Sequence, residues 1–240
     1  MISVIIPTKN EAKNIEHCLV SLIHQNFKGK YEVILVDGYS TDGTVKYARK
    51  HIKKIYQYSI HRQVPRGPAA ARNYGAKLAK YPIVAFIDAD CIARDDWLQR
   101  IWDNFQRDKE LVGVGGILAP RDPRLIDIIM FTLFSDWWVK ISSWLGIWQL
   151  YGNNCAYRRS AFLKQKGFST TISFWEDTEL SMRMKKVGKL YIDRNMVVWT
   201  STRRFRQKGY GSVFMINLKA FIDHLLGRPI TERYFEEIEH

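Results

Sequence analysis

Two aspartates separated by one residue follow a short apolar run in the sequence. Asp88-Ala89-Asp90 comes directly after residues 83–87, five apolar residues that are typical of a buried strand. Carboxylates at positions i and i+2 of a strand point to the same side, where their charges repel unless a cation lies between them. Mg²⁺ typically combines one or two carboxylates with substrate phosphates. The spacing therefore indicates a cation site, with two solvated turn aspartates as the alternative.

A second acidic group, Glu176-Asp177-Thr178-Glu179, coincides with a predicted helix start. Acidic side chains are favoured in a first helical turn by the helix dipole, so a purely structural role is one interpretation. A carboxylate held in position can also take a proton from a reacting hydroxyl group. The cluster is therefore also a candidate for base catalysis.

A basic cluster, Arg203, Arg204, Arg206 and Lys208, lies within six residues near the end of the chain. Such runs are ordinarily solvated loops. Arginines aimed at a departing diphosphate would, however, stabilise the negative charge that it gains. The cluster is therefore also a candidate phosphate-binding site.

The first half of the chain predicts the element order that would position these groups. Strands are expected at residues 3–7, 32–37, 55–60 and 83–87, with helices at 12–25, from a start within residues 41–44, and at 68–80. This alternation favours a largely parallel sheet with helices on both faces, and ligands bind such sheets at the carboxyl ends of the strands. Residues 7–11, Asp37 and the Asp88–Asp90 motif are then predicted to share one rim.

Two other side chains are candidates from their expected positions. Asp37 follows the second strand, where it could accept hydrogen bonds from ribose hydroxyls or a base N–H; a turn or helix cap is the alternative. Arg72, on the helix after Pro68, could reach a diphosphate or the Asp88–Asp90 loop, with a structural ion pair as the alternative.

The second half predicts strands at residues 111–119 and 189–199 and helices at 176–188 and 212–226. Residues 125–148 are apolar and mostly helical in period, and they include four of the eight tryptophans. This stretch is interrupted by three charged residues, Asp127, Asp136 and Lys140. The uncharged runs between them are shorter than the ~20 apolar residues that a spanning helix needs. We expect a buried helix or an amphipathic helix on a membrane surface. The chain is treated as one catalytic domain, 1–240, with halves 1–118 and 119–240.

The composition narrows the partners and the compartment. A net charge of +13 favours polyanionic partners such as nucleic acid, anionic membranes or phosphorylated substrates. Three widely spaced cysteines, without metal-ligand spacing, predict neither a disulfide framework nor a zinc site. The N-terminus reads as a strand and lacks a signal-peptide pattern. We therefore expect a cytoplasmic protein, or one peripheral to the inner face of the cell membrane.

Five sequence elements in order closely resemble the family 2 glycosyltransferases. They are IIPTKNE at 5–11, VDGYSTDGT at 36–44, ARN at 71–73, DAD at 88–90 and WEDTEL at 175–180. The resemblance covers roughly residues 1–210 and rests on the order of the elements rather than on any single one. It implies the A-type glycosyltransferase fold, a Rossmann-like, mostly parallel mixed sheet flanked by helices. It also implies an inverting transfer of a hexose from a nucleoside-diphosphate sugar, with Mn²⁺ or Mg²⁺ at the motif.

The same resemblance assigns roles to individual residues. Asp90, with Asp88, would bind the metal, and Asp177 would be the catalytic base. If the acceptor is a phosphate monoester, whose second pKa is about 6, it is already ionised and Asp177 would only organise the site. The expected donor-binding residues are Pro7, Thr8, Asn10, Glu11, Asp37, Arg72, Asp88, Ala89, Arg203 and Arg204. The expected acceptor or sugar residues are Gly116, Asn154, Glu176 and Glu179.

The acceptor and the base of the donor stay open at this stage. GDP-mannose and UDP-glucose are the donor types that we favour, and the acceptor is a sugar or a lipid-linked phosphate, such as a polyprenyl phosphate. The tryptophan-rich stretch is consistent with peripheral membrane contact. The alternatives are a nucleotidyltransferase acting on sugar phosphates and a non-catalytic basic binder of membranes or nucleic acid. We expect no nucleic-acid partner.

Overall fold

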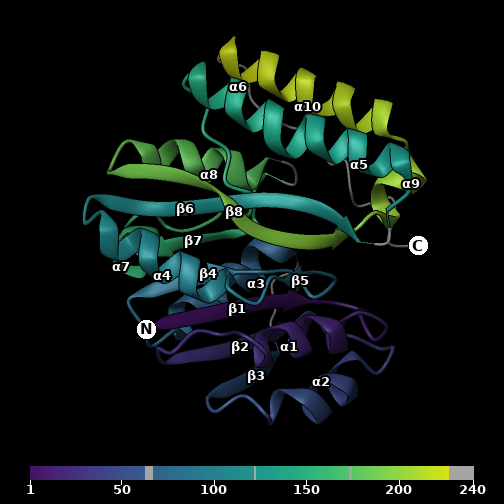
Figure 1. The fold of residues 1–240 in the computed structure, drawn as a ribbon, viewed down its shortest axis with the longest axis vertical. Coiled ribbons are helices and arrows are strands. Elements are labelled where there is room, and N and C mark those ends of the chain that lie inside the picture. The colour runs from purple at the N-terminus through teal and green to yellow at the C-terminus, as the bar shows by residue number, and fades with distance from the viewer. Residues whose placement is uncertain (63–66, 122, 173–174, 227–240) are drawn as a thin grey trace.

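A computed structural model describes residues 1–62, 67–121, 123–172 and 175–226; the side chains of residues 134–136, 204, 224 and 225 are not described. One eight-stranded sheet runs through the molecule in the order β3-β2-β1-β4-β7-β6-β8-β5 (Figure 1). Its strands are β1 (Ile2–Thr8), β2 (Tyr31–Asp37), β3 (Tyr58–Arg62), β4 (Ile83–Phe86), β5 (Ile92–Ala93), β6 (Leu111–Arg121), β7 (Cys155–Arg158) and β8 (Lys189–Ser201).

The sheet is parallel on the N-terminal side and mixed beyond it. Strand β1 pairs in parallel with β2 and β4, and β2 with β3, as the sequence predicts. Strand β7 is antiparallel to both β4 and β6, whereas β6 and β8 are parallel. The boundary expected after residue 118 falls inside β6, so the sheet is continuous across the two proposed halves.

Helices cover both faces of this sheet. They are α1 (Ile15–Ile23), α2 (Thr44–Ile52), α3 (Pro68–Leu78), α4 (Trp97–Arg107), α7 (Arg159–Lys164) and α8 (Glu176–Lys185). Alternate residues of β1 face opposite layers: Val4 and Ile6 pack with Leu19 of α1, and Ile5 packs in the layer that contains α3. A side chain at Gly75 of α3 would lie 2.5 Å from Ile5, so glycine permits this close helix–strand contact.

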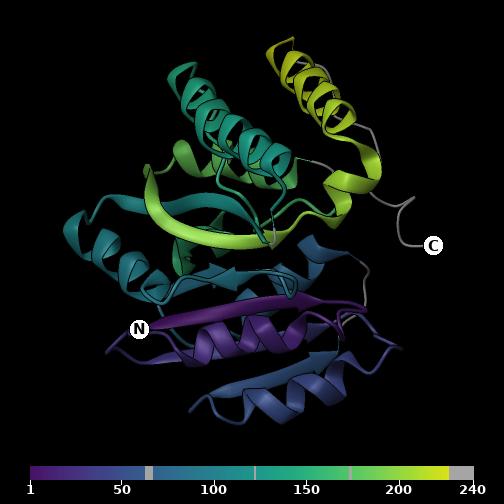
Figure 2. The same ribbon diagram turned by 45° about the vertical axis from the view of Figure 1, so that its right-hand side comes forward.

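The remaining helices form an outer layer on the C-terminal half of the sheet (Figures 1 and 2). They are α5 (Leu125–Phe131), the π-helix η1 (Thr132–Trp138), α6 (Val139–Trp144), α9 (Arg203–Lys208) and α10 (Tyr210–Leu225). Aromatic contacts join them, with the ring centroids of Phe131 and Phe205 5.0 Å apart and those of Trp138 and Phe221 5.2 Å apart. In the described part of the chain, no helix is long and apolar enough to cross a membrane.

Several element boundaries differ from those expected. The strand expected at 55–60 is Tyr58–Arg62, because Ile55 packs in the core beyond the end of α2. The helix expected from residue 12 begins at Ile15, and the helical stretch expected to reach residue 148 ends at Trp144. Helices α4 and α7 and strands β5 and β7 were not expected from the sequence, and the basic cluster, for which a loop was the ordinary expectation, forms helix α9.

A buried carboxylate ties this outer layer together. Asp127 on α5 is fully buried, pairs with Arg206 of α9, and accepts hydrogen bonds from the Tyr210 hydroxyl at 2.5 Å and the Arg124 backbone N–H at 2.7 Å. These hydrogen bonds, above all the one from Arg206, hold the pKa of Asp127 well below its ordinary value. One side chain thus connects α5 with α9 and α10.

We expect Asp127→Asn to lower the free energy of unfolding by about 2 kcal/mol at pH 7, the range for a hydrogen-bonded charged group. Because the folded-state pKa is depressed, the contribution of Asp127 is present above its unfolded pKa and is lost as the pH falls through the folded value. The difference between wild type and variant in urea unfolding should therefore shrink below about pH 4. The exposed Asp103→Asn is the control; equal effects of both variants would contradict this role.

Candidate active site

The carboxyl ends of β1 and β2 form the first wall of the candidate site. Thr8 and Asp37 are register partners in these strands, and the Gly38 N–H donates to the Thr8 carbonyl at 2.8 Å. Asp37 is fully buried and accepts a hydrogen bond from the Ser40 N–H at 3.2 Å. The buried Thr8 hydroxyl has no hydrogen-bond partner within the described residues. Thr8 and Asp37 therefore lie on one rim of the sheet, as the sequence predicts.

The loop after β1 is fastened to the loop after β2. Asn10 has a left-handed backbone (φ 54°), and its Oδ1 accepts a hydrogen bond from the Thr41 N–H at 3.0 Å. The Glu11 N–H donates to the Thr44 hydroxyl at 2.8 Å. Pro7 is buried in β1 beside Val36. Asn10 and Pro7 therefore shape this wall. The side-chain amide oxygen of Asn10 accepts its hydrogen bond from within the protein.

The two aspartates of the DAD motif lie in a turn, not on a strand. Strand β4 ends at Phe86, and the Cys91 N–H closes the turn by donating to the Asp88 carbonyl at 3.1 Å. Ala89 is buried, whereas Asp88 and Asp90 are partly exposed. Burial raises the pKa of the Cys91 thiol, and the charges of Asp90 and Asp88 raise it further. The carboxylates of Asp88 and Asp90 are therefore both close enough to affect the pKa of Cys91.

The structure describes no group of three or more His, Cys, Asp or Glu side chains that could hold a metal ion, within the ranges given above. The pair Asp88 and Asp90 nevertheless suits a hard divalent cation that takes its remaining ligands from substrate phosphates and water.

Arg72 links the DAD turn to the acidic cluster. Glu176 in that cluster is 104 residues away from Arg72 along the chain. The side chain of Arg72 is only 4% exposed, and it donates to Asp88 at 2.7 Å and to Glu176 at 3.2 Å. Burial alone would lower the pKa of this guanidinium, but the two carboxylates outweigh burial and raise it. The plane also lies over the Phe168 ring, 5.3 Å from its centroid. The ion pair considered from the sequence is therefore present, and it joins two parts of the site.

The acidic cluster sits at the first turn of α8. Trp175 caps that helix with a left-handed backbone (φ 71°). Asp177 accepts hydrogen bonds from the Thr178 N–H at 2.7 Å and from the Gly152 N–H at 3.1 Å. Burial raises the pKa of Asp177 in spite of these bonds, and burial followed by the Asp177 charge raises the pKa of Glu176. Asp177 is thus a fixed carboxylate with an increased affinity for a proton.

Two expected acceptor residues are built into the framework. Asn154 is fully buried; its Oδ1 accepts from the Trp97 indole N–H at 2.9 Å, and its Nδ2 donates to the carbonyls of Ile117 (2.8 Å) and Met196 (3.0 Å). Gly116 is buried beside it, and a Cβ there would lie 1.8 Å from the Met196 carbonyl oxygen. Both residues hold β6 and β8 at the turn before β7, and the buried amide of Asn154 does not face a sugar.

We expect Asn154→Ala to lower the free energy of unfolding by about 3 kcal/mol, because it leaves buried donors and acceptors on three elements unpaired. Urea unfolding measures this loss. Asn153→Ala, on the neighbouring and more exposed residue, is the matched control. An unchanged stability of Asn154→Ala would contradict the framework role.

Glu179 and the basic cluster take different positions. The Glu179 carboxylate forms an ion pair with Arg183 one helical turn later, at 2.5 Å. Arg203, at the start of α9, reaches across the molecule to Glu11, with 3.3 Å between Nη2 and Oε1. Arg206 instead pairs with Asp127, and the side chain of Arg204 lies outside the described residues. Arg203 therefore contacts the loop after β1, at the first wall of the candidate site.

The turn at residues 151–154 contacts both the acidic cluster and the DAD turn, which its sequence does not predict. Gly152 donates its N–H to Asp177, and a Cβ at Gly152 would lie 3.1 Å from the Arg72 guanidinium. Asn153 donates to the Cys91 sulfur at 3.6 Å, beside Asp90. The only sequence signal was the Gly-Asn-Asn composition of a turn, which does not indicate its neighbours.

Comparison with known proteins gives the decisive observation. The family model for glycosyl transferase family 2 matches residues 3–164, more than half of the chain. The chain is a family 2 glycosyltransferase. This membership confirms the resemblance to the family; four of the five motifs lie within the matched residues, and WEDTEL at 175–180 lies beyond them.

The transferase is 30% identical over 218 residues to a dolichyl N-acetyl-α-D-glucosaminyl phosphate 3-β-D-2,3-diacetamido-2,3-dideoxy-β-D-glucuronosyltransferase from Methanococcus voltae, covering 84% of the chain and 67% of that protein. It is 42% identical over 101 residues to glycosyltransferase AglE from Haloferax volcanii, covering 41% of the chain and 33% of AglE. The chain thus matches a third of one relative's length and two thirds of the other's.

A solved structure confirms the fold class. The mannosyltransferase PcManGT from Pyrobaculum calidifontis, in complex with GDP-mannose and Mn²⁺, superposes with a TM-score of 0.66 at 24% identity, over 82% of this chain and 56% of that one. The transferase therefore has the A-type glycosyltransferase fold, a mostly parallel mixed sheet flanked by helices.

Proposed function

We propose that the transferase moves a hexose, with inversion, from a GDP-mannose or UDP-glucose type donor to an acceptor hydroxyl or phosphate. The observation that carries the proposal is the buried Arg72 bridge. It ties Asp88, one of the two carboxylates of the proposed cation site, to Glu176, which precedes the fixed carboxylate of raised pKa, Asp177. A leaving-group site and a base are thereby held at two ends of one guanidinium.

The donor side would consist of the first wall, which we call the nucleotide wall, and the DAD turn. Asp37 and the Thr8 hydroxyl offer hydrogen-bonding groups to a nucleoside, between the loops shaped by Pro7, Asn10 and Glu11. Asp90, with Asp88, would hold Mn²⁺ or Mg²⁺, which when bound neutralises charge on the diphosphate. Arg203, which is half exposed and pairs with Glu11, is placed to add a second positive charge, and we extend this role to Arg204.

The acceptor side follows from Asp177. An acceptor oxygen forms the new bond to the anomeric carbon while the bond from that carbon to the diphosphate oxygen breaks. Asp177 takes the proton of the acceptor hydroxyl, and its raised pKa increases its strength as a base. Glu176, held by Arg72, keeps the first turn of α8 facing the DAD turn. Glu179 acts only through its ion pair with Arg183 at the surface of this helix.

For the acceptor we propose a lipid-linked phosphate or sugar at a membrane surface. The name of the Methanococcus voltae relative describes transfer to a dolichyl-phosphate-linked sugar. A net charge of +13 suits both a phosphorylated acceptor and an anionic membrane. The protein would then work as a peripheral membrane protein on the cytoplasmic side.

A donor screen tests the proposal. The transferase is incubated with Mn²⁺, an α-linked GDP- or UDP-hexose and lipid extract, and the anomeric configuration of the product is read by NMR coupling constants. Inversion predicts a β-linked product from an α-linked donor. A product that retains the α configuration would overturn the single-displacement mechanism, and transfer from a sugar phosphate in place of a nucleotide sugar would overturn the donor class.

A further inference from the structure

The solvent side of the α5–η1–α6 segment is apolar. On a helix surface, residues four apart lie on the same side. Large apolar side chains recur at this spacing from residue 125 to residue 141 and are followed by Trp144, the most exposed of them at 84%. Exposed apolar side chains also lie on α10 and just after it. We call this set the apolar face: Leu125, Ile126, Ile128, Ile129, Leu133, Trp137, Ile141, Trp144, Leu145, Met215, Ile222 and Leu226.

The same helices bury a different set of side chains against the protein. Phe131 and Trp138 pack on Phe205 and Phe221, and Trp138 also borders the small core formed by Ile147, Trp175 and Phe221. The apolar face is therefore additional to the face that folding needs. Large exposed apolar patches of this kind mark interaction sites.

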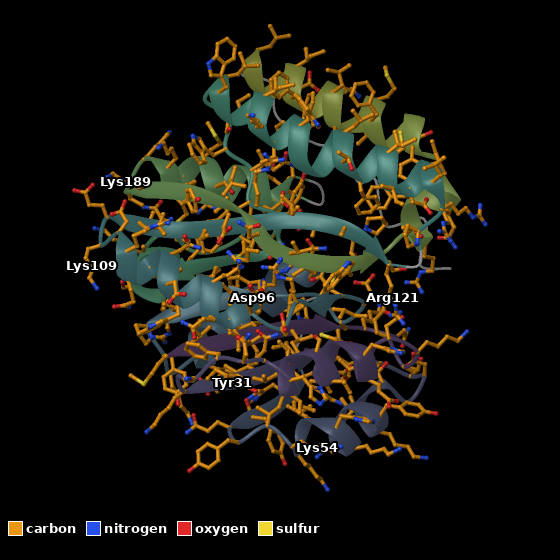
Figure 3. The ribbon with its side chains drawn as sticks, in the orientation of Figure 1. Tyr31, Lys54, Asp96, Lys109, Arg121 and Lys189 are labelled. Atoms are coloured by element: carbon orange, nitrogen blue, oxygen red, sulfur yellow. The ribbon has the colours of Figure 1, made fainter. Side chains whose placement is uncertain are left out.

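Charge and aromatic character indicate what the face contacts. Residues 121–145 and 203–226 together carry eight Lys and Arg against four Asp, and no Glu. Arg121, labelled in Figure 3, ends β6 on the side where α5 begins. The Lys140 ammonium lies 5.8 Å from the centroid of the Trp137 ring. Exposed tryptophans beside basic residues suit the headgroup region of a bilayer, and basic side chains are attracted to anionic lipids.

We propose that the apolar face docks on an anionic lipid bilayer, with α5, η1, α6 and α10 lying in the plane of the interface. The spacing of apolar and basic side chains is that of an interfacial helix layer, and no described helix could span the bilayer instead. Arg203 of the adjoining α9 pairs with Glu11, so the docked layer continues directly into the nucleotide wall. Docking itself needs no transfer reaction; the proposed function enters only in what docking delivers, an acceptor in the same membrane.

Vesicle sedimentation tests this docking without donor, metal or acceptor. The full chain should bind vesicles of phosphatidylcholine with 30% phosphatidylglycerol, bind less to pure phosphatidylcholine, and bind less at high salt. Trp137→Ser/Trp144→Ser should reduce the partition coefficient by at least about tenfold, since it removes two large apolar side chains from the bilayer. Tyr47→Ser/Tyr56→Ser, which removes two exposed aromatics from the other end of the molecule, should bind as wild type does.

Three results would overturn the proposal. They are no binding to anionic vesicles, equal binding by both double variants, and a vesicle-independent dimer in sedimentation velocity that Trp137→Ser/Trp144→Ser dissociates. The last would assign the face to a second copy of the chain. Circular dichroism verifies that each variant is folded. Since sedimentation uses neither donor nor acceptor, whereas the donor screen measures transfer, a failure of docking and a failure of the proposed reaction are distinguishable.

Discussion

Asp177→Asn is expected to lower kcat by about 10²- to 10⁴-fold, the usual contribution of a positioned general base. The variant keeps the shape of the side chain but cannot take the acceptor proton. The KM for the donor should change little, because Asp177 lies at α8 with Gly152 and Thr178 as its hydrogen-bond donors and not on the nucleotide wall. Single-turnover kinetics with saturating donor measure the effect.

The pH dependence distinguishes a base from an organising residue. Burial raises the pKa of Asp177, so kcat of the wild type should fall as the pH is lowered through a pKa above the ordinary aspartate value of about 3.9. This acid limb should be absent from the residual activity of Asp177→Asn. Glu179→Gln, two residues away and paired with Arg183, is the matched control and should keep the wild-type profile. A phosphate acceptor with full activity in Asp177→Asn would contradict the base role.

Arg72→Met is expected to lower both stability and activity. Removing one partner of a buried ion pair costs about 3 kcal/mol, because the remaining charges lose their counter-charge. Here two carboxylates, Asp88 and Glu176, would be left. The loss of their positions should also reduce kcat/KM by about 10²-fold, the effect of misplacing catalytic groups by about 1 Å. Urea unfolding and steady-state kinetics measure the two effects.

The pH dependence of the Arg72→Met deficit has a definite sign. Arg72 opposes the burial that raises the pKa of Glu176, so without it the folded-state pKa of Glu176 rises further above its unfolded value. A carboxyl whose pKa is raised in the folded state lowers the free energy of unfolding at pH values where it is ionised. The difference in free energy of unfolding between wild type and Arg72→Met should therefore shrink as the pH falls from 8 to 6. Arg94→Met removes a partly exposed ion pair with Asp96 and should cost less than about 1 kcal/mol. Equal costs for the two variants would contradict the buried bridge.

The sequence predicts the N-terminal half well because buried parallel strands leave a strong local signal. Residues 83–87 and 33–36 are apolar runs, and both belong to strands that end at the rim where Asp37 and the DAD motif were expected. The sequence also predicts that Arg72 can reach the DAD turn, because a parallel sheet places the start of its helix at that rim.

The second half depends on contacts between distant residues. Strand β7 has only four residues and lies antiparallel between β4 and β6, an arrangement that no local pattern encodes. Asn154 was expected among the residues that contact the acceptor or the sugar. The structure instead surrounds its amide with Trp97, Ile117 and Met196, from three separate parts of the chain. Likewise, only the folded chain brings Gly152 to Asp177.

Calorimetric titration of GDP and UDP, with and without Mn²⁺, tests the central claim most directly. The wild-type transferase should bind one of the two diphosphates in the presence of Mn²⁺ and bind it at least about tenfold more weakly without the metal. Asp90→Ala should lose the metal-dependent part of this affinity while it keeps the folded-state stability, because Asp90 is partly exposed in its turn. Diphosphate binding that is independent of Mn²⁺, or equal in wild type and Asp90→Ala, would contradict the assignment of the DAD turn as the diphosphate anchor.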